Sequence, residues 1–189
     1  MRALMVSLLA AHGWVWAAPL QITVTDAQGR AVPNVVIALE QAGLPRLAKP
    51  GTLAQIAQRN RQFDPRLLVI QTGTAVNFPN EDKVRHHVYS YSPAKTFELK
   101  LYLGQPAEPV LFDKSGVVPL GCNIHDPMSA TVVVVDTPVY GVTDAKGELR
   151  LERDPAAGRL RAWHAGLSKP ELLSEALPPG TSSFRWVLP

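Results

Sequence analysis

The sequence predicts an all-β protein with a Greek-key β-sandwich in its middle part. Seventeen prolines and thirteen glycines punctuate the 189-residue chain, and residues of these two types mark turns and interrupt helices. Between the turns lie short runs rich in valine, isoleucine, threonine and aromatic residues, which is the composition of β-strands. About seven or eight such runs follow one another in fewer than about a hundred residues, as in a Greek-key sandwich.

The composition argues against two classes of function. Hydrophobic residues make up 46% of the chain and charged residues 19%, enough for one good core or two small ones. The formal net charge is only +3. So small an excess of positive charge gives no reason to expect binding to nucleic acid or to an anionic membrane surface.

Residues 1–17 have the pattern of a secretory signal peptide. Arg2 precedes the apolar run Ala3–Ala11, which is shorter than the ~18 residues that a membrane-spanning helix needs. Small side chains around Ala17–Ala18 suit signal peptidase. We therefore expect cleavage there and an exported protein without stable membrane insertion; the alternative is an uncleaved membrane anchor.

The first segment after this signal predicts a β-hairpin. Apolar residues alternate over Leu20–Glu40, around a turn at Asp26–Gly29 where aspartate can bond its own backbone and glycine can adopt a positive φ. The segment Val142–Gly147 repeats Val24–Gly29 almost letter for letter and predicts a second hairpin with the same turn. Later strands are expected at Leu149–Leu151, Leu160–Trp163 and Ser182–Leu188.

The segment Gly43–Arg61 does not decide between helix and strand. Its apolar residues fit both periods, so we expect an irregular link with a first strand near Gln55–Arg59. From Phe63 onward the alternation sharpens and turn residues separate the runs. The strands expected there are Arg66–Gln71, Ala75–Phe78, Val84–Ser92, Thr96–Tyr102, Val110–Phe112, Gly116–Cys122 and Thr131–Val135.

One short loop carries three potential metal ligands. Cys122 and Met128 lie three residues either side of His125, and they are the only cysteine and methionine left after signal cleavage. An exported cysteine normally pairs, so a lone one forms an intermolecular disulfide, stays reactive or binds metal. A thiolate, an imidazole and a thioether together favour copper over zinc. Taken singly, each residue also has a structural interpretation, as a buried thiol, core filling or part of a turn.

A copper site of this type needs a second histidine, and the strand around Val84–Ser90 offers two. Successive strand residues point to opposite faces, so His86 and His87 cannot both face one site without a bulge. Alternation alone leaves open which of the two faces the loop.

These motifs resemble the cupredoxins, the small blue-copper family, over residues 55–136. The loop Cys122–Met128 is similar to the short ligand loop of amicyanins. The stretches Gly73–Asp82 and His86–Ser90 look like the GTxVxFxNxD…HNV region of plastocyanin-like proteins, in which the first histidine binds copper.

The resemblance implies a ligand set of His86, Cys122, His125 and Met128 for one copper ion. His87 departs from the family pattern, which usually has asparagine there to tie the two ligand loops together. This departure leaves a ligand swap to His87 open and predicts a different rigidity or reduction potential.

The whole chain is similar to exported bacterial proteins called methylamine utilisation proteins, and its flanks resemble a carboxypeptidase-regulatory or transthyretin-like β-sandwich that the copper domain splits. The organisation implied is a signal peptide at 1–17, a copper domain at 50–136, and a flanking sandwich formed by 18–45 and 137–189.

The resemblance implies a periplasmic electron carrier whose copper alternates between copper(I) and copper(II) and whose partner is a redox protein. An enzyme is not expected, because catalytic copper centres need further histidine clusters and only His87 and His164 remain. The alternatives are a copper carrier or storage protein without a redox partner, and a structural β-sandwich whose metal site has lapsed. Copper affinity and resistance to chelators distinguish these three.

Overall fold

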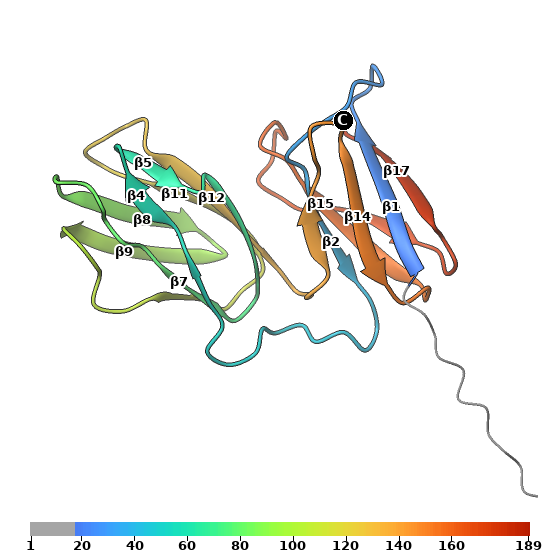
Figure 1. The fold of residues 1–189 in the computed structure, drawn as a ribbon, viewed down its shortest axis with the longest axis horizontal. Coiled ribbons are helices and arrows are strands. Elements are labelled where there is room, and N and C mark those ends of the chain that lie inside the picture. Colours follow the sequence, from blue (N-terminus) through green and yellow to red (C-terminus); the bar gives the residue numbers. More distant parts are fainter. Residues whose placement is uncertain (1–17) are drawn as a thin grey trace, which may run out of the picture.

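The computed structural model describes residues 18–189, which form seventeen β-strands and no helix (Figure 1). The predicted all-β fold class is therefore confirmed. The predicted signal peptide lies outside the described residues. Within residues 18–189, no helix is long and apolar enough to cross a membrane.

The middle of the chain folds into one β-sandwich. Its larger sheet has the strand order β6-β12-β11-β8-β9, its smaller sheet has the order β10-β7-β3, and β4 and β5 form a separate two-stranded ribbon. An apolar core that includes Phe78, Val88, Phe112 and Val132 fills the sandwich. The strands are β3 (Leu53–Gln55), β4 (Ala57–Arg59), β5 (Gln62–Asp64), β6 (Leu67–Gln71), β7 (Thr74–Asn77), β8 (His86–Ser92), β9 (Lys95–Tyr102), β10 (Val110–Phe112), β11 (Gly116–Gly121) and β12 (Ser129–Val135).

The two ends of the chain together form a second sandwich, which lies beside the first (Figure 1). Its sheets have the orders β14-β1-β17 and β13-β2-β15-β16, and its core contains Leu20, Ile37, Leu160 and Trp186. The strands are β1 (Ala18–Thr25), β2 (Val36–Glu40), β13 (Tyr140–Val142), β14 (Glu148–Arg153), β15 (Gly158–Trp163), β16 (Leu173–Leu177) and β17 (Ser183–Val187).

The ambiguous segment Gly43–Arg61 contains two short strands where one was expected near Gln55–Arg59. β3 pairs with β7 and β4 pairs with β5, and Ile56 between them is fully buried. The chain therefore changes partner at Ile56, which explains why a single period, helical or strand, could not decide the structure of the segment.

Both predicted hairpins are wrong, although both predicted turns form. Asp26 Oδ1 accepts hydrogen bonds from the backbone amides of Gln28 and Arg30, and Asp144 Oδ1 makes the equivalent bonds in the second turn. However, β1 and β2 belong to different sheets, and so do β13 and β14. Each turn therefore passes the chain across the sandwich and does not fold it back on its own sheet.

The burial of β2 gives the physical reason for the crossing. Val35, Ile37 and Leu39 face the core of the second sandwich, whereas Val36 and Ala38 face the first. A strand that is buried on both faces has a continuous apolar run. Such a strand lies between two layers, and β2 accordingly forms part of the sheet that faces the first sandwich, where it pairs with β13 and β15, while β1 pairs with β14 and β17 in the other sheet.

The side of β2 that faces the first sandwich belongs to a third apolar cluster, which joins the two halves of the molecule. Val36 and Trp163 pack there against Val117, Val133 and Val135 of β11 and β12. Because Val132 and Val134 point into the first core, β12 is buried on both of its faces. We call this contact the inter-sandwich cluster.

The two repeated turns contact each other at one end of the second sandwich. The backbone amide of Val24 donates to the carbonyl of Gly147 at 2.8 Å. A Cβ atom at Gly147, whose φ is +71°, would lie 2.4 Å from the carbonyl oxygen of Val24. Its counterpart Gly29, with φ +76°, has no atom within 4 Å of its Cβ position.

This difference predicts unequal losses of stability for the same substitution. Gly29→Ala incurs only the strain of a left-handed backbone, about 1 kcal/mol, whereas Gly147→Ala adds a backbone clash and should cost about 3 kcal/mol or more. Urea unfolding followed by tryptophan fluorescence measures both losses, because Trp163 and Trp186 belong to this half. Equal losses in the two variants would contradict the prediction.

Candidate metal centre

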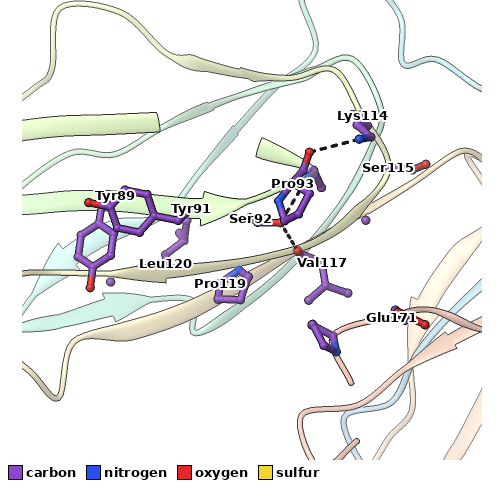
Figure 2. A pocket seen from close by; sticks show the side chains of 14 residues that line it. Tyr89, Tyr91, Ser92, Pro93, Lys114, Ser115, Val117, Pro119, Leu120 and Glu171 are labelled. Atoms are coloured by element: carbon purple, nitrogen blue, oxygen red, sulfur yellow. Dashed lines mark hydrogen bonds between the residues drawn. The ribbon is translucent and has the colours of Figure 1, made fainter. Parts of the chain in front are cut away.

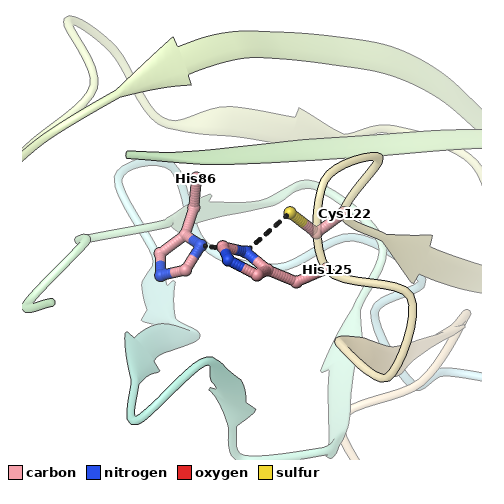
Figure 3. Close-up of side chains that lie close together, drawn as sticks. All are labelled: His86, Cys122 and His125. Carbon is pink, nitrogen blue, oxygen red and sulfur yellow. Dashed lines mark hydrogen bonds between the residues drawn. The ribbon is translucent and has the colours of Figure 1, made fainter. Parts of the chain in front are cut away.

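Three of the predicted ligands converge at one end of the first sandwich (Figure 3). Potential ligand atoms of His86, Cys122 and His125 all lie within 4.8 Å of one another. The two Nδ1 atoms are 3.1 Å apart, and Cys122 Sγ lies 3.9 Å from His125 Nδ1. His86 and Cys122 are buried, whereas His125 is only partly buried.

The strand order of the large sheet produces this convergence. β11 lies between β8 and β12, so the loop that follows Gly121 and leads to Ser129 emerges beside the start of β8, where His86 lies. The loop folds back as a tight turn in which the amide of Met128 donates to the carbonyl of His125 at 2.9 Å.

The spacing of the three donor atoms fits a metal ion. Metal bonds of about 2.0 Å to imidazole nitrogen and about 2.3 Å to thiolate sulfur place the donors around one ion roughly 3 to 4 Å apart. The observed separations of 3.1 and 3.9 Å lie in this range. Two nitrogens and one thiolate also form a donor set that suits copper.

Of the two adjacent histidines, the structure brings His86 to the cluster and turns His87 away. The pairing of β8 with β9 shifts register between His86 and Val88, and Nε2 of His87 lies 2.8 Å from Oε1 of Glu98 on β9. Nδ1 of His87 is buried and has no hydrogen-bond partner within residues 18–189. His87 therefore occupies the opposite face of the sheet from the cluster.

Met128 and His164 have different positions relative to the cluster. Met128 is 1% exposed and belongs to the same core cluster as Cys122; its role as a ligand remains a prediction. His164 follows β15 in the second sandwich, where its Nδ1 accepts a hydrogen bond from the amide of Gly166 at 3.1 Å.

Asp82 holds the ring of His86 from behind, a contact that the sequence analysis missed. Its Oδ2 lies 2.8 Å from Nε2 of His86. Its two oxygens also accept hydrogen bonds from the backbone amides of Asn60 and Arg61 at 2.7 and 2.9 Å. These two residues form the turn between β4 and β5 and have φ values of 52° and 55°.

The hydrogen bond with Asp82 determines which nitrogen of His86 carries a proton. Burial alone would raise the pKa of Asp82, but the hydrogen bonds from Arg61, His86 and Asn60 together hold this pKa below its usual value. An ionised carboxylate only accepts hydrogen bonds, so Nε2 of His86 carries the proton. With a proton on Nε2, Nδ1 is the nitrogen that can present a lone pair to a metal ion at the cluster.

Asp82 can be read from the sequence as a carboxylate four residues before His86, but the sequence does not show that it contacts the ring of His86. Asp82 becomes recognisable only when the β4–β5 turn delivers the two amides that fix it, and that turn comes from the segment whose structure the sequence left undecided.

Several solved structures are similar in shape to part of the chain. A copper-containing nitrite reductase of Thermus scotoductus SA-01 is 23% identical with a TM-score of 0.41, and the match covers 46% of this chain and 23% of the reductase. A purple cupredoxin of Nitrosopumilus maritimus is 25% identical with a TM-score of 0.38, over 43% of this chain and 98% of the other. An amicyanin of Paracoccus versutus is 15% identical with a TM-score of 0.38, over 52% and 96%.

No protein-family model and no curated protein sequence matches the chain.

The Asp82 contact leads to a prediction about metal affinity. Asp82→Ala removes the acceptor that orients His86, so copper(I) should bind about 10- to 100-fold more weakly, as measured by competition with a chelator. The control is Asp113→Ala, because Asp113 is an exposed carboxylate that pairs with Lys95 at 3.1 Å. Unchanged affinity in Asp82→Ala, with an intact fold by circular dichroism, would show that Asp82 does not position His86.

Proposed function

We propose that the protein is a mononuclear copper protein that carries electrons. His86, Cys122 and His125 are its principal ligands and Met128 is a weaker one. The observation that carries the proposal is the convergence of two imidazole nitrogens and a thiol sulfur within 4.8 Å. This donor set, with sulfur and nitrogen but no carboxylate, favours copper among the transition metals.

Copper bound there would supply one-electron chemistry, alternating between copper(I) and copper(II). The protein's own contribution is a rigid set of ligands that needs little rearrangement. Cys122 directly follows β11, the ring of His86 is held by Asp82, and Met128 is packed in the core. Burial of His86 and Cys122 keeps water away from the thiolate.

The partly exposed ring of His125 provides a route for electrons to leave the site. It lies on the loop beside Ile124, an apolar residue that is 48% exposed. We therefore propose that a redox protein docks at this loop. Complexes between electron-transfer proteins are weak and bury small interfaces. An exposed apolar residue beside the ring of His125 is suited to such an interface.

The positions of the other histidines support a carrier over a copper enzyme. His87 is paired with Glu98 and His164 lies in the second sandwich, so within residues 18–189 they add no ligands to the cluster. The periplasm is the proposed location, on the basis of the signal-like pattern of residues 1–17.

A copper carrier without a redox partner is the second candidate. The same exposure of His125 gives a chelator or another protein access to the site, so exchange of the metal is compatible with this geometry. Bound copper that chelators remove readily would favour this carrier.

The visible absorption spectrum after addition of copper(II) tests the proposed function. We expect an intense thiolate-to-copper charge-transfer band that Cys122→Ser and His86→Ala abolish. His87→Ala is the matched control and should keep the band, because His87 lies on the other face of the sheet. Absence of the band from the unmutated protein would refute the electron-carrier proposal, and loss of the band in His87→Ala alone would move the ligand to His87.

The reduction potential tests the role of Met128. A thioether stabilises copper(II) relative to a site that lacks this donor, so Met128→Leu should raise the potential. A tenfold change in the ratio of copper(II) to copper(I) affinity corresponds to about 59 mV, and a shift of at least this size is expected by voltammetry. An unchanged potential would show that Met128 serves only the core.

A further inference from the structure

The outer face of the large sheet carries a groove that neither core fills (Figure 2). The inter-sandwich cluster covers this face over β12 and the start of β11. Beyond Val117 the cover ends, and a groove of about 640 Å³ opens. It lies between Tyr89 and Tyr91 of β8 and Pro170, which precedes β16 in the second sandwich.

Flat rings dominate the lining of the groove. The rings of Tyr89 and Tyr91 lie 5.2 Å apart, and the pyrrolidine rings of Pro93, Pro119 and Pro170 complete the walls. Tyr91 is 74% exposed, so much of its surface has no partner in the structure. Surfaces of this kind favour a flat aromatic ligand, because aromatic rings stack with offset or edge contacts.

The charges around the groove balance each other. Among residues 18–189, Lys114 and Glu171 are the only charged residues that line it, and the ammonium of Lys114 already donates to the carbonyl of Pro93 at 3.3 Å. One charge of each sign at the rim gives no net attraction for an ion, so the electrostatics complement an uncharged molecule.

The size and position of the groove also argue for a small molecule. Pockets for small ligands commonly measure about 300 to 1,000 Å³, are mostly apolar and lie at boundaries between domains. This groove continues directly from the established contact between the two sandwiches, and the second sandwich supplies one wall through Pro170. A protein partner would need a much larger surface than this concave site provides.

We propose that the groove binds a small, uncharged, planar aromatic molecule between the two sandwiches. The inference goes beyond the proposed electron transfer and does not depend on copper. Such a ligand would contact Tyr89. The ring of Tyr89 packs directly on Gly121, because a Cβ atom added at Gly121 would lie only 2.8 Å from the ring.

Nuclear magnetic resonance with 2-naphthol as the probe tests the proposal on the full-length ¹⁵N-labelled protein, both metal-free and copper(I)-loaded. We expect saturable amide shifts in β8, β11 and the loop before β16, with a Kd on the order of 1 mM in both states. Because the metal-free protein is tested as well, failure of copper binding does not affect the result.

Variants and probes of altered shape make the test specific. Tyr91→Ala removes an exposed ring and should weaken binding about tenfold, whereas Leu111→Ala, a 49% exposed residue on the other sheet, should leave it unchanged. Decahydro-2-naphthol, which is not flat, and the anion naphthalene-2-sulfonate should both bind at least about fivefold more weakly than 2-naphthol.

Three outcomes would overturn the proposal. The first is the absence of saturable shifts at the groove, and the second is equal binding of decahydro-2-naphthol. The third is a concentration-dependent dimer in sedimentation that Tyr91→Ala abolishes, which would assign the groove to a second copy of the chain.

Discussion

The burial of β12 on both faces is the constraint on which the rest of the molecule depends. Val132 and Val134 pack into the first core while Val133 and Val135 contact the second sandwich. A strand that contributes to two apolar clusters has no freedom to shift or rotate, because a slip of one residue would exchange its two faces. The loop that carries Cys122 and His125 ends where this strand begins, so the same packing that joins the two halves also anchors the candidate metal centre.

Local sequence patterns were enough for the all-β class, for most strands of the middle sandwich and for the loop that carries Cys122, His125 and Met128. These features depend on residues close together in the chain, where turn-forming residues and the alternation of apolar and polar residues are informative. The loop is recognisable in the sequence because its ligand types and their spacing are local. Its approach to His86 depends on the order of β8, β11 and β12 in one sheet, which alternation does not reveal.

Long-range features escaped prediction for identifiable reasons. The alternation around Asp26–Gly29 predicts a hairpin that includes Val35–Leu39, although an apolar run without polar interruptions is typical of a strand buried on both faces. The choice between His86 and His87 depends on the register shift beside Val88, and a bulge has no signature in the residues themselves. Asp82 acquires its role through two amides from a turn more than twenty positions earlier in the chain.

The pairing of β2 with β13 brings the two ends of the middle sandwich together, with Tyr140 opposite Ala38. The first sandwich is thus continuous in sequence, whereas the second is assembled from both ends of the chain. During synthesis, every strand of the first sandwich has emerged once β12 is complete. β1 must wait for β14 and β17, its only partners in the described sheets. The apolar side chains of β1 therefore stay exposed longest, and the order of translation makes them the segment most in need of protection from aggregation.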